Sequence, residues 1–424
     1  MLLTRFLQDR KASVAPMLAL CTIPLFGFVG AAVDYSNASS VRTSMQAALD
    51  STALMLSKTA GSISQSQLQQ SATALFGANF NRPEAQNLQV TVAYGQQANG
   101  AAVTVTGSAT MQTKFMGALG FPTINISSTA AVNWSNSRLR VALVLDNTGS
   151  MAQSGKMDAL KTAAHNLLTQ LKNAAQVDGD VYVSIIPFGK DVNVGASNHD
   201  ASWIDWTDWD AANGTCSNWS YHSKSSCNSH GATWTPKDHS TWNGCVTDRD
   251  QNYDTLNTAP ASGGTLFPAE QYSSCNVEIM PLNYDWTALN SKIDAMSPAG
   301  NTNQAIGLAW GWQSLSQVSP LNAPPQDPNY TYQTVIILLS DGLNTQDRWY
   351  SSASAIDTRQ QIACTNAKSA GIMIYTVLVM SGDSTVLRNC ATDSTKYFAL
   401  TNANQIITTF QTIGTSLAKL HLTH

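Results

Sequence analysis

Four continuous apolar runs in the C-terminal part of the chain restrict its fold more than any other feature. They are LRVALVLD (139–146), VYVSIIPF (181–188), TVIILLSD (334–341) and IMIYTVLVM (372–380). Because apolar and polar residues do not alternate in these runs, the strands that they predict must be covered on both faces of a sheet. Helical patterns separate the runs, at 157–171, 356–369 and 404–420. The alternation predicts an α/β domain with a doubly wound, mostly parallel sheet over residues 136–424.

An insert at about 194–285 interrupts this pattern and has no comparable periodicity. It holds most of the tryptophans of the chain and four of its cysteines. We therefore predict a loop or subdomain that disulfides and aromatic packing hold together. The Trp203, Trp206 and Trp209 series allows two interpretations, which are a binding platform for a sugar or a partner and the buried packing of the insert.

The N-terminus combines a basic start with a long uncharged segment. Arg5, Arg10 and Lys11 precede a stretch from Ala12 to Val33 that carries no charge. At ~1.5 Å per residue, this stretch is long enough for a helix to cross a hydrocarbon core of roughly 30 Å. We predict a cytoplasmic tail and a transmembrane helix over residues 1–33, with the rest of the chain exported. The alternative is a signal peptide that is cleaved close to Gly30, and it also exports the rest.

Residues 34–135 predict a second unit with a different pattern. The helical spacing of apolar residues continues to about residue 58, so a long helix opens this unit. Three short alternating runs follow and are separated by turn residues, which predicts a small antiparallel sheet. They are LQVTVAY (88–94), AAVTVTGSA (101–109) and INISSTAAVNW (124–134).

Six cysteines lie outside the N-terminal apolar segment, and an even number fits disulfides in an oxidising compartment. Six cysteines allow fifteen pairings, so the sequence alone does not define the connectivity. Cys364 and Cys390 are predicted to pair because the strand at 372–380 lies between them and can bring the preceding helix beside the following loop. Pairing of neighbours in the insert predicts Cys216–Cys227 and Cys245–Cys275.

The stretch DNTGS (146–150) directly follows the first apolar strand, and Asp341 ends the third. Since ligands of parallel sheets bind at the carboxyl ends of the strands, we expect Asp146 and Asp341 to share one crevice. Two carboxylates this close repel each other unless a cation lies between them. The hydroxyl groups of Thr148 and Ser150 lie on the same loop as Asp146. Thr302 opens a predicted helix, and its hydroxyl group can reach the same crevice. Two carboxylates and three hydroxyls suit a hard divalent cation, Mg²⁺ first, with Ca²⁺ and Mn²⁺ as alternatives.

These elements resemble the von Willebrand factor A domain, whose metal-ion-dependent adhesion site combines a D-x-S-x-S loop, a distant Thr and a distant Asp. The matching stretches are DNTGS (146–150), GNTNQAIGL with Thr302, and LLSDG with Asp341. Thr148 stands in place of the central Ser of the family and keeps the ligand oxygen. The resemblance implies that the bound ion accepts an Asp or Glu carboxylate of a partner. It implies ligation without catalysis, so we do not expect an enzyme.

The first sixty residues resemble the TadE/TadG proteins of the tight-adherence (Flp) pilus machinery. A short basic start, one apolar span and the helical stretch AAVDYSNASSVRTSMQAALDSTAL carry the resemblance. Together with a C-terminal A domain, it implies a TadG-like pilus assembly protein of the bacterial inner membrane. Such a protein would cross the membrane lipid once and have its C-terminal bulk in the periplasm. Its partners would be other pilus assembly proteins or pilin, bound through an acidic residue.

Two rival functions stay open from the sequence. The first is an exported surface adhesin that recognises its ligands through the Trp-rich insert. The second is a zinc-dependent enzyme whose site lies among the Cys and His residues of the insert, although their spacing matches no zinc finger. Nucleic acid is excluded as a partner because the net charge is −4 and no cluster of Lys and Arg follows the first dozen residues.

Overall fold

The computed structural model describes residues 14–61, 63–97, 100–134, 137–175, 177–328, 330–380, 382 and 384–422. The chain divides into two compact units, Met1–Ser135 and Asn136–His424. The polar and apolar patterns of the sequence change at the same place, because the first unit has one covered sheet face and the second has two. Each unit has its own hydrophobic core and is described separately.

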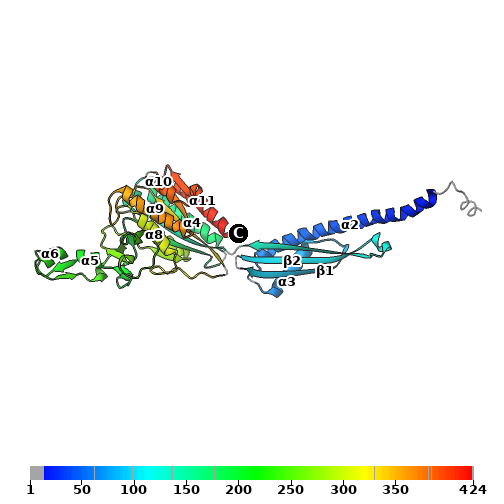
Figure 1. The fold of residues 1–424 in the computed structure, drawn as a ribbon, viewed down its shortest axis with the longest axis horizontal. Coiled ribbons are helices and arrows are strands. Elements are labelled where there is room, and N and C mark those ends of the chain that lie inside the picture. Colours follow the sequence, from blue (N-terminus) through cyan, green and yellow to red (C-terminus); the bar gives the residue numbers. More distant parts are fainter. Residues whose placement is uncertain are drawn as a thin grey trace, which may run out of the picture. The chain divides into compact units, whose positions relative to one another are not determined.

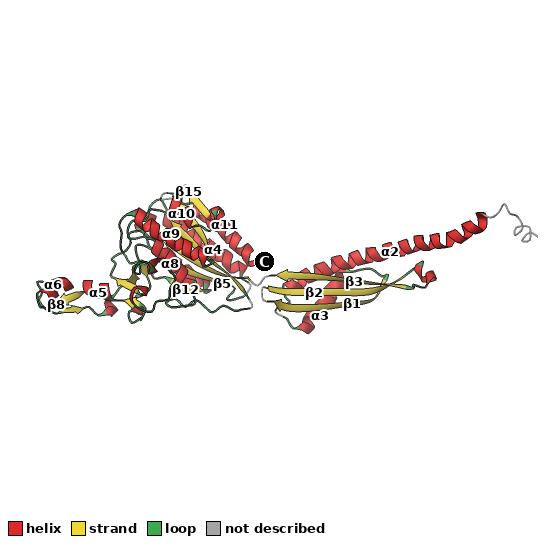
Figure 2. Ribbon diagram, viewed as in Figure 1, coloured by secondary structure: helices red, strands yellow, loops and turns green. Residues whose placement is uncertain are grey.

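The N-terminal unit packs two helices on one antiparallel sheet (Figures 1 and 2). Its elements are α2 (Val14–Ser57), α3 (Gln65–Asn79), β1 (Ala85–Gln97), β2 (Gly100–Gln112) and β3 (Thr123–Trp134). The buried side chains Met45 and Leu49 of α2 pack on β2, where Gly107 leaves room for them. A Cβ atom at Gly107 would lie 3.3 Å from the methyl groups of Leu49. The long helix and the small sheet that the sequence predicts are therefore one packed unit.

One buried carboxylate ties α2 to the turn before β3. Asp34 accepts hydrogen bonds from the backbone N–H groups of Lys114, Phe115 and Met116, at 3.0, 2.8 and 2.8 Å. Burial acts to raise the pKa of Asp34, but the three hydrogen bonds outweigh it and lower the pKa below its ordinary value. The ionised carboxylate therefore fixes the 3₁₀ turn Met116–Leu119 against the helix.

The predicted transmembrane helix over residues 1–33 is wrong. In the ranges given above, no helix has a stretch that is both long and apolar enough to cross a membrane. Residues 14–33 are the first part of the 44-residue helix α2. The inner-membrane location with a periplasmic C-terminal bulk, and membrane lipid as a partner, rested on this anchor and fall with it. Residues 1–13, which carry the predicted cytoplasmic tail, lie outside the described ranges.

The C-terminal unit is built around a six-stranded sheet in the order β12-β5-β4-β13-β14-β15. All neighbouring pairs are parallel except β12 with β5, which is antiparallel and places β12 at one edge. The strands are β4 (Ser137–Asp146), β5 (Val181–Phe188), β12 (Met280–Asn283), β13 (Thr331–Ser340), β14 (Met373–Val379) and β15 (Tyr397–Leu400). The prediction of a doubly wound, mostly parallel sheet is confirmed.

Helices cover both faces of this sheet. One hydrophobic core joins the sheet to α4 (Lys156–Ala174), α7 (Trp286–Asp294) and α11 (Gln405–Leu422). The other joins it to α8 (Gln304–Ser314), α9 (Ala353–Ser369) and α10 (Ser384–Cys390). Leu143 and Leu145 of β4 belong to the first core, and Ala142 and Val144 to the second. This is why the strand sequences are apolar without alternation.

The insert forms a subdomain with a small sheet and a hairpin. Its sheet has the order β6-β10-β11-β7, and its hairpin pairs β8 with β9. The elements are β6 (Val192–Asn193), β7 (Ile204–Asp205), α5 (Thr207–Ala212), β8 (Gly214–Cys216), α6 (Lys224–Ser229), β9 (Trp234–Pro236), β10 (Cys245–Val246) and β11 (Phe267–Glu270). Figure 1 shows α5 and α6 at the end of the unit away from the central sheet.

Aromatic packing explains the tryptophan series of the insert. Trp206 stacks on His239 with ring centroids 3.8 Å apart and meets Trp209 and Trp242 edge to face. Trp203 packs edge to face on Trp310 of α8, so it joins the insert to the main core. Of these residues, Trp209, Trp242 and Trp310 are buried. The series is therefore internal packing of the insert and does not form an open platform.

Three disulfides join the pairs of cysteines that the sequence analysis expects. Cys216–Cys227 closes the hairpin end of the insert, and Cys245–Cys275 holds β10 to the segment after β11. Cys364–Cys390 links α9 to α10 over the second face of the main sheet. The Cα atoms of the three pairs are 5.7, 5.8 and 5.1 Å apart, which is the ordinary range for disulfides.

Candidate functional site

Two buried aspartates meet at the carboxyl edge of the main sheet. β4 ends at Asp146, and Asp341 follows the last residue of its parallel neighbour β13. The residues are 0% and 1% exposed. Parallel strands bring their carboxyl ends to the same edge, so the apolar runs that build the core also place these carboxylates together.

Hydroxyl groups of the DNTGS loop hold both carboxylates. Thr148 Oγ1 donates to Asp146 Oδ1 at 2.6 Å, and Ser150 Oγ donates to Asp341 Oδ1 at 2.6 Å. Ser340 Oγ donates to the second oxygen of Asp146 at 2.6 Å. Each hydroxyl donates its one hydrogen bond to a carboxylate. The lone pairs of its oxygen therefore stay available to bind a cation.

The loop geometry suits an octahedral ion. The oxygens of Thr148 and Ser150 are 3.1 Å apart. Neighbouring ligands of an octahedral Mg²⁺ with bonds of about 2.1 Å are roughly 3 Å apart, so the two hydroxyls have the separation of adjacent ligands. Within the described ranges, no group of three or more His, Cys, Asp or Glu side chains could hold a metal ion. The candidate site differs from such groups because three of its five side chains, those of Thr148, Ser150 and Thr302, carry hydroxyl groups.

The Thr302 loop is bound to the same place through its backbone. Gly149 N–H donates to the carbonyl oxygen of Gly300 at 3.0 Å, and Ala299 N–H donates to that of Asn147 at 2.9 Å. Thr302 is buried, and its N–H donates to Thr345 Oγ1 at 2.8 Å. Side-chain hydrogen bonds thus connect Asp146 to Thr148 and Ser150 to Asp341. The two hydroxyl oxygens lie next to each other, and backbone bonds hold the loop of Thr302 beside them.

Burial makes the site sensitive to charge. Burial and, secondly, the charge of Asp341 raise the pKa of Asp146 to about 6, although the hydrogen bonds from Ser340 and Thr148 act to lower it.

The sequence did not predict two residues of this site. Ser340 directly precedes Asp341, and Lys156 opens α4 and forms a buried ion pair with Asp341. The position of Ser340 in the strand could have shown its role, since residues 340 and 146 end neighbouring strands.

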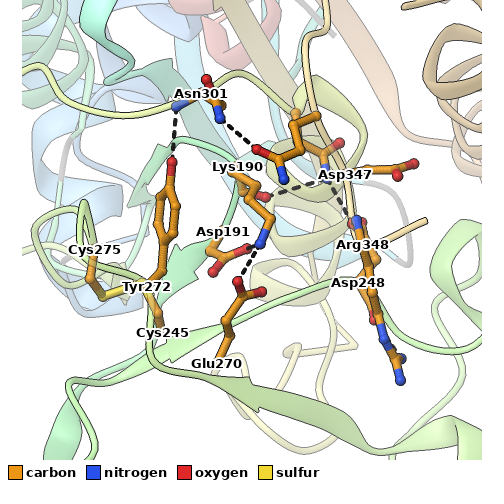
Figure 3. Close-up of polar contacts among 12 residues, drawn as sticks. Lys190, Asp191, Cys245, Asp248, Glu270, Tyr272, Cys275, Asn301, Asp347 and Arg348 are labelled. Atoms are coloured by element: carbon orange, nitrogen blue, oxygen red, sulfur yellow. Dashed lines mark hydrogen bonds and ion pairs between the residues drawn. A yellow bond between two sulfur atoms is a disulfide. The ribbon is translucent and has the colours of Figure 1, made fainter. Parts of the chain in front are cut away.

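Polar side chains of the insert contact the segment that carries Thr302 (Figure 3). Tyr272 of the insert accepts a hydrogen bond from the N–H of Asn301 at 3.1 Å, next to Thr302. Lys190, just after β5, pairs with Glu270 of β11 and lies 3.7 Å from Asp191. The insert is therefore fixed to the loop that carries Thr302 and is a structural part of the site.

Asp248 of the insert is buried close to α8. Its Oδ2 accepts a hydrogen bond from Asn303 Nδ2 at 2.8 Å and one from the backbone N–H of Arg348 at 3.2 Å. Figure 3 shows Asp248 beside Arg348. Burial and, secondly, the charge of Asp347 raise the pKa of Asp248 to about 7. The folded state therefore binds a proton here more tightly than the unfolded state, where the pKa is close to 3.8.

The Asp248→Asn variant should reduce the pH dependence of unfolding. A raised folded-state pKa contributes stability below pH ~4 that is lost as the pH rises through ~7, on the order of a few kcal/mol. Asn keeps an oxygen acceptor but does not ionise, so the loss of stability between these values should be smaller in the variant. Chemical unfolding of both proteins across this pH range measures the difference. Asp250→Asn is the control, because the Asp250 side chain is 51% exposed, and an equal change in both variants would contradict the assignment.

Zinc binding in the insert is not supported by the structure. Cys216, Cys227 and Cys245 are all in disulfides, so they provide no thiolate ligands. His230 stacks on Tyr221, and His239 hydrogen-bonds to Asp210 at 2.8 Å. These residues pack within the insert and do not converge on one point.

Comparison with solved structures finds pilus and matrix proteins at low similarity. The pilus adhesin SpaC from Lactobacillus rhamnosus GG is 13% identical, with a TM-score of 0.39 over 81% of this chain and 36% of that chain. The vWF domain of the type V pili tip protein Mfa5 from Porphyromonas gingivalis is 11% identical, with a TM-score of 0.38 over 66% of this chain and 95% of that one. Proximal thread matrix protein 1 from the mussel byssus, with a zinc-occupied MIDAS motif, is 14% identical. Its TM-score is 0.35 over 67% of this chain and 46% of that chain.

This chain covers only about a third of the SpaC chain and less than half of the mussel protein. Similarity at this level does not define a function. A comparison with curated proteins gives no match. A comparison with family models gives one, which falls on α2: residues 12–55 match the Tad family, described as Flp pilus-assembly TadE/G-like.

Proposed function

We propose that this protein acts in pilus assembly or adhesion by binding a carboxylate of a partner through a divalent cation, Mg²⁺ first. Its C-terminal unit would be a von Willebrand factor A domain. The observation that carries the proposal is the pair of loop hydroxyls, 3.1 Å apart, that hydrogen-bond to two buried carboxylates at the edge of a parallel sheet. The ion would be held by Asp146, Thr148, Ser150, Thr302 and Asp341.

Each part of this site has a separate task. The hydroxyls of Thr148 and Ser150 provide neutral oxygen ligands. The carboxylates of Asp146 and Asp341 accept the hydrogen bonds of these hydroxyls and supply negative charge. A bound cation would supply a Lewis-acidic position that a carboxylate of a partner can occupy. Few charged groups would touch the ion directly, so its attraction for that carboxylate is preserved. Tyr272 of the insert and Lys190 after β5 contact residues on either side of Thr302, Asn301 and Asn303, and would shape the contact with a partner.

One observation supports the assignment to pili, and another supports the A-domain arrangement. Residues 12–55 match the TadE/G-like family, which the sequence resemblance also indicates. The sheet order with one antiparallel edge strand supports an A-domain arrangement for the second unit. The partners would then be other pilus components with an exposed acidic residue. A surface adhesin is the alternative, and Trp219 on the insert, 84% exposed, is the observation that favours it.

The Thr148→Val variant should abolish pilus formation, or pilus-dependent attachment if the protein is an adhesin. Val has the shape of Thr but lacks the hydroxyl, so the ion loses one ligand while the buried space stays filled. Cells that lack the gene are complemented with each variant, pili are counted by electron microscopy, and attachment to a surface is measured. Thr148→Ser is the matched control and should behave as the wild type. If Thr148→Val supports both pili and attachment, the proposed function is wrong.

A further inference from the structure

Lys156 places a positive charge inside the candidate cation site. Its Nζ forms an ion pair with Asp341 Oδ2, while Oδ1 of the same carboxylate accepts from Ser150. The side chains of Lys156 and Asp341 are only 7% and 0% exposed. The two oxygens of Asp341 are thus divided between the ammonium group and the hydroxyl that faces Thr148.

The position of Lys156 opposes two general preferences of lysine. Lysine is rarely buried unless it is paired, because its charge loses water. Lys156 is also the first residue of α4, and the N-terminus of a helix disfavours a positive charge. Local rules that fail at one residue point to a role in function, since packing alone would favour a neutral side chain.

The backbone before α4 directs this lysine into the site. Ser154 and Gly155 both have left-handed conformations, with φ of 55° and 69°. Met151 before this turn and Met157 after it are buried in the core, so the turn is fixed on both sides. Lys156 is therefore held near Asp341 by the fold and does not reach it by chance from a mobile surface position.

We propose that Lys156 is a built-in counter-charge that makes the ion-loaded site depend on a partner's carboxylate, an inference that rests on the proposed function. Asp146 and Asp341 give the site two negative charges, and Lys156 reduces them to one. A divalent cation then leaves one excess positive charge, which the carboxylate of a partner neutralises. Without Lys156 the loaded site would already be neutral before the partner binds.

This charge balance has two consequences. Lys156 weakens the binding of the ion alone, because like charges repel strongly in a buried site. It also strengthens the binding of an anionic ligand to the loaded site for the same electrostatic reason. Ion and partner carboxylate should therefore bind cooperatively in the wild type, and the protein should hold the ion firmly only when a partner is present.

Titration of the EDTA-treated full chain with MgCl₂ tests the proposal by calorimetry, in NaCl and in sodium acetate of equal ionic strength. Lys156→Met and Lys156→Gln should bind Mg²⁺ about tenfold more tightly than the wild type in NaCl. Acetate is the carboxylate probe and should increase the Mg²⁺ affinity of the wild type more than that of either variant. Gln still donates a hydrogen bond to Asp341, so it serves if the Met variant does not fold.

Two controls separate charge from structure. Lys156→Arg keeps the charge and should behave as the wild type. Lys161→Met removes a charge from the same helix at a residue that bonds to the Asp294 carbonyl oxygen, away from the site, and should also behave as the wild type.

The outcomes distinguish this inference from the proposed function. Wild-type Mg²⁺ binding with equal or weaker binding by both neutral variants overturns the role of Lys156 and leaves the function intact. Binding by the neutral variants alone supports the inference, because the lysine then blocks the empty site. If no protein binds Mg²⁺, both proposals are wrong.

Discussion

Replacing both Cys364 and Cys390 by Ala should lower the stability of the C-terminal unit by roughly 3–4 kcal/mol. Both residues are buried in the core that joins α9 and α10 to the sheet. The disulfide closes a loop with a sequence separation of 26, which contains the whole of β14. Its loss increases the conformational entropy of the unfolded chain, and Ala avoids placing unpaired hydroxyls in the core.

Urea unfolding followed by tryptophan fluorescence measures this effect. All tryptophans except Trp134 lie in the C-terminal unit, so the signal reports on that unit. The double variant Cys216→Ala/Cys227→Ala is the control. Its disulfide closes the hairpin end of the insert, where local opening does not require the main sheet to unfold. An unchanged midpoint for the Cys364/Cys390 variant, or an equal loss in the control, would contradict this account.

The sequence predicted the carboxyl edge of the main sheet because several patterns agree there. The continuous apolar run before Asp146 requires a strand buried on both faces, and the run before Asp341 requires a second one. Parallel pairing of these strands then brings the two carboxylates together without further information. Local sequence and global topology specify the same arrangement. This part of the fold could therefore be predicted from the continuous apolar runs and the aspartates that follow them.

The contribution of Lys156 could not be predicted in the same way. Its Nζ reaches Asp341 because two consecutive left-handed residues turn the chain before α4. Gly155 favours this conformation, but Ser154 does not, and tertiary packing decides it. A lysine at the start of an amphipathic helix is usually exposed. The sequence pattern therefore predicts an exposed Lys156, whereas in the fold its side chain is buried against Asp341.

The insert shows a second limit of sequence reasoning. Its tryptophans follow no helical or strand period, because they pack on one another and on His239 instead of on one regular surface. The burial of Asp248 depends on Asn303 and Arg348, which lie 55 and 100 residues away in the chain. Contacts of this range leave no local pattern.

The wrong transmembrane prediction has a different origin, since it relied on the absence of charge more than on the apolar content of the segment.

The Asp146→Ala variant should lose all stabilisation by Mg²⁺ and still fold. Asp146 is completely buried at the edge of the sheet, and its charge repels that of Asp341 when no cation is present. Removing it relieves this repulsion, although Thr148 and Ser340 each lose a hydrogen-bond acceptor. In the wild type, Mg²⁺ at a hundredfold excess over Kd should contribute about 2.7 kcal/mol to stability. Asp158→Ala is the matched control, because Asp158 is an exposed carboxylate in the first turn of α4.

Thermal melts of the full chain with MgCl₂ and with EDTA test the cation site most directly. Mg²⁺ at this excess should raise the Tm of the C-terminal unit by roughly 4–5 °C in the wild type and in Asp158→Ala. The Tm of Asp146→Ala should be the same with MgCl₂ and with EDTA. A wild-type Tm that does not respond to Mg²⁺, or an Asp146→Ala variant with the full wild-type response, would contradict the proposal that this residue helps to hold a divalent cation.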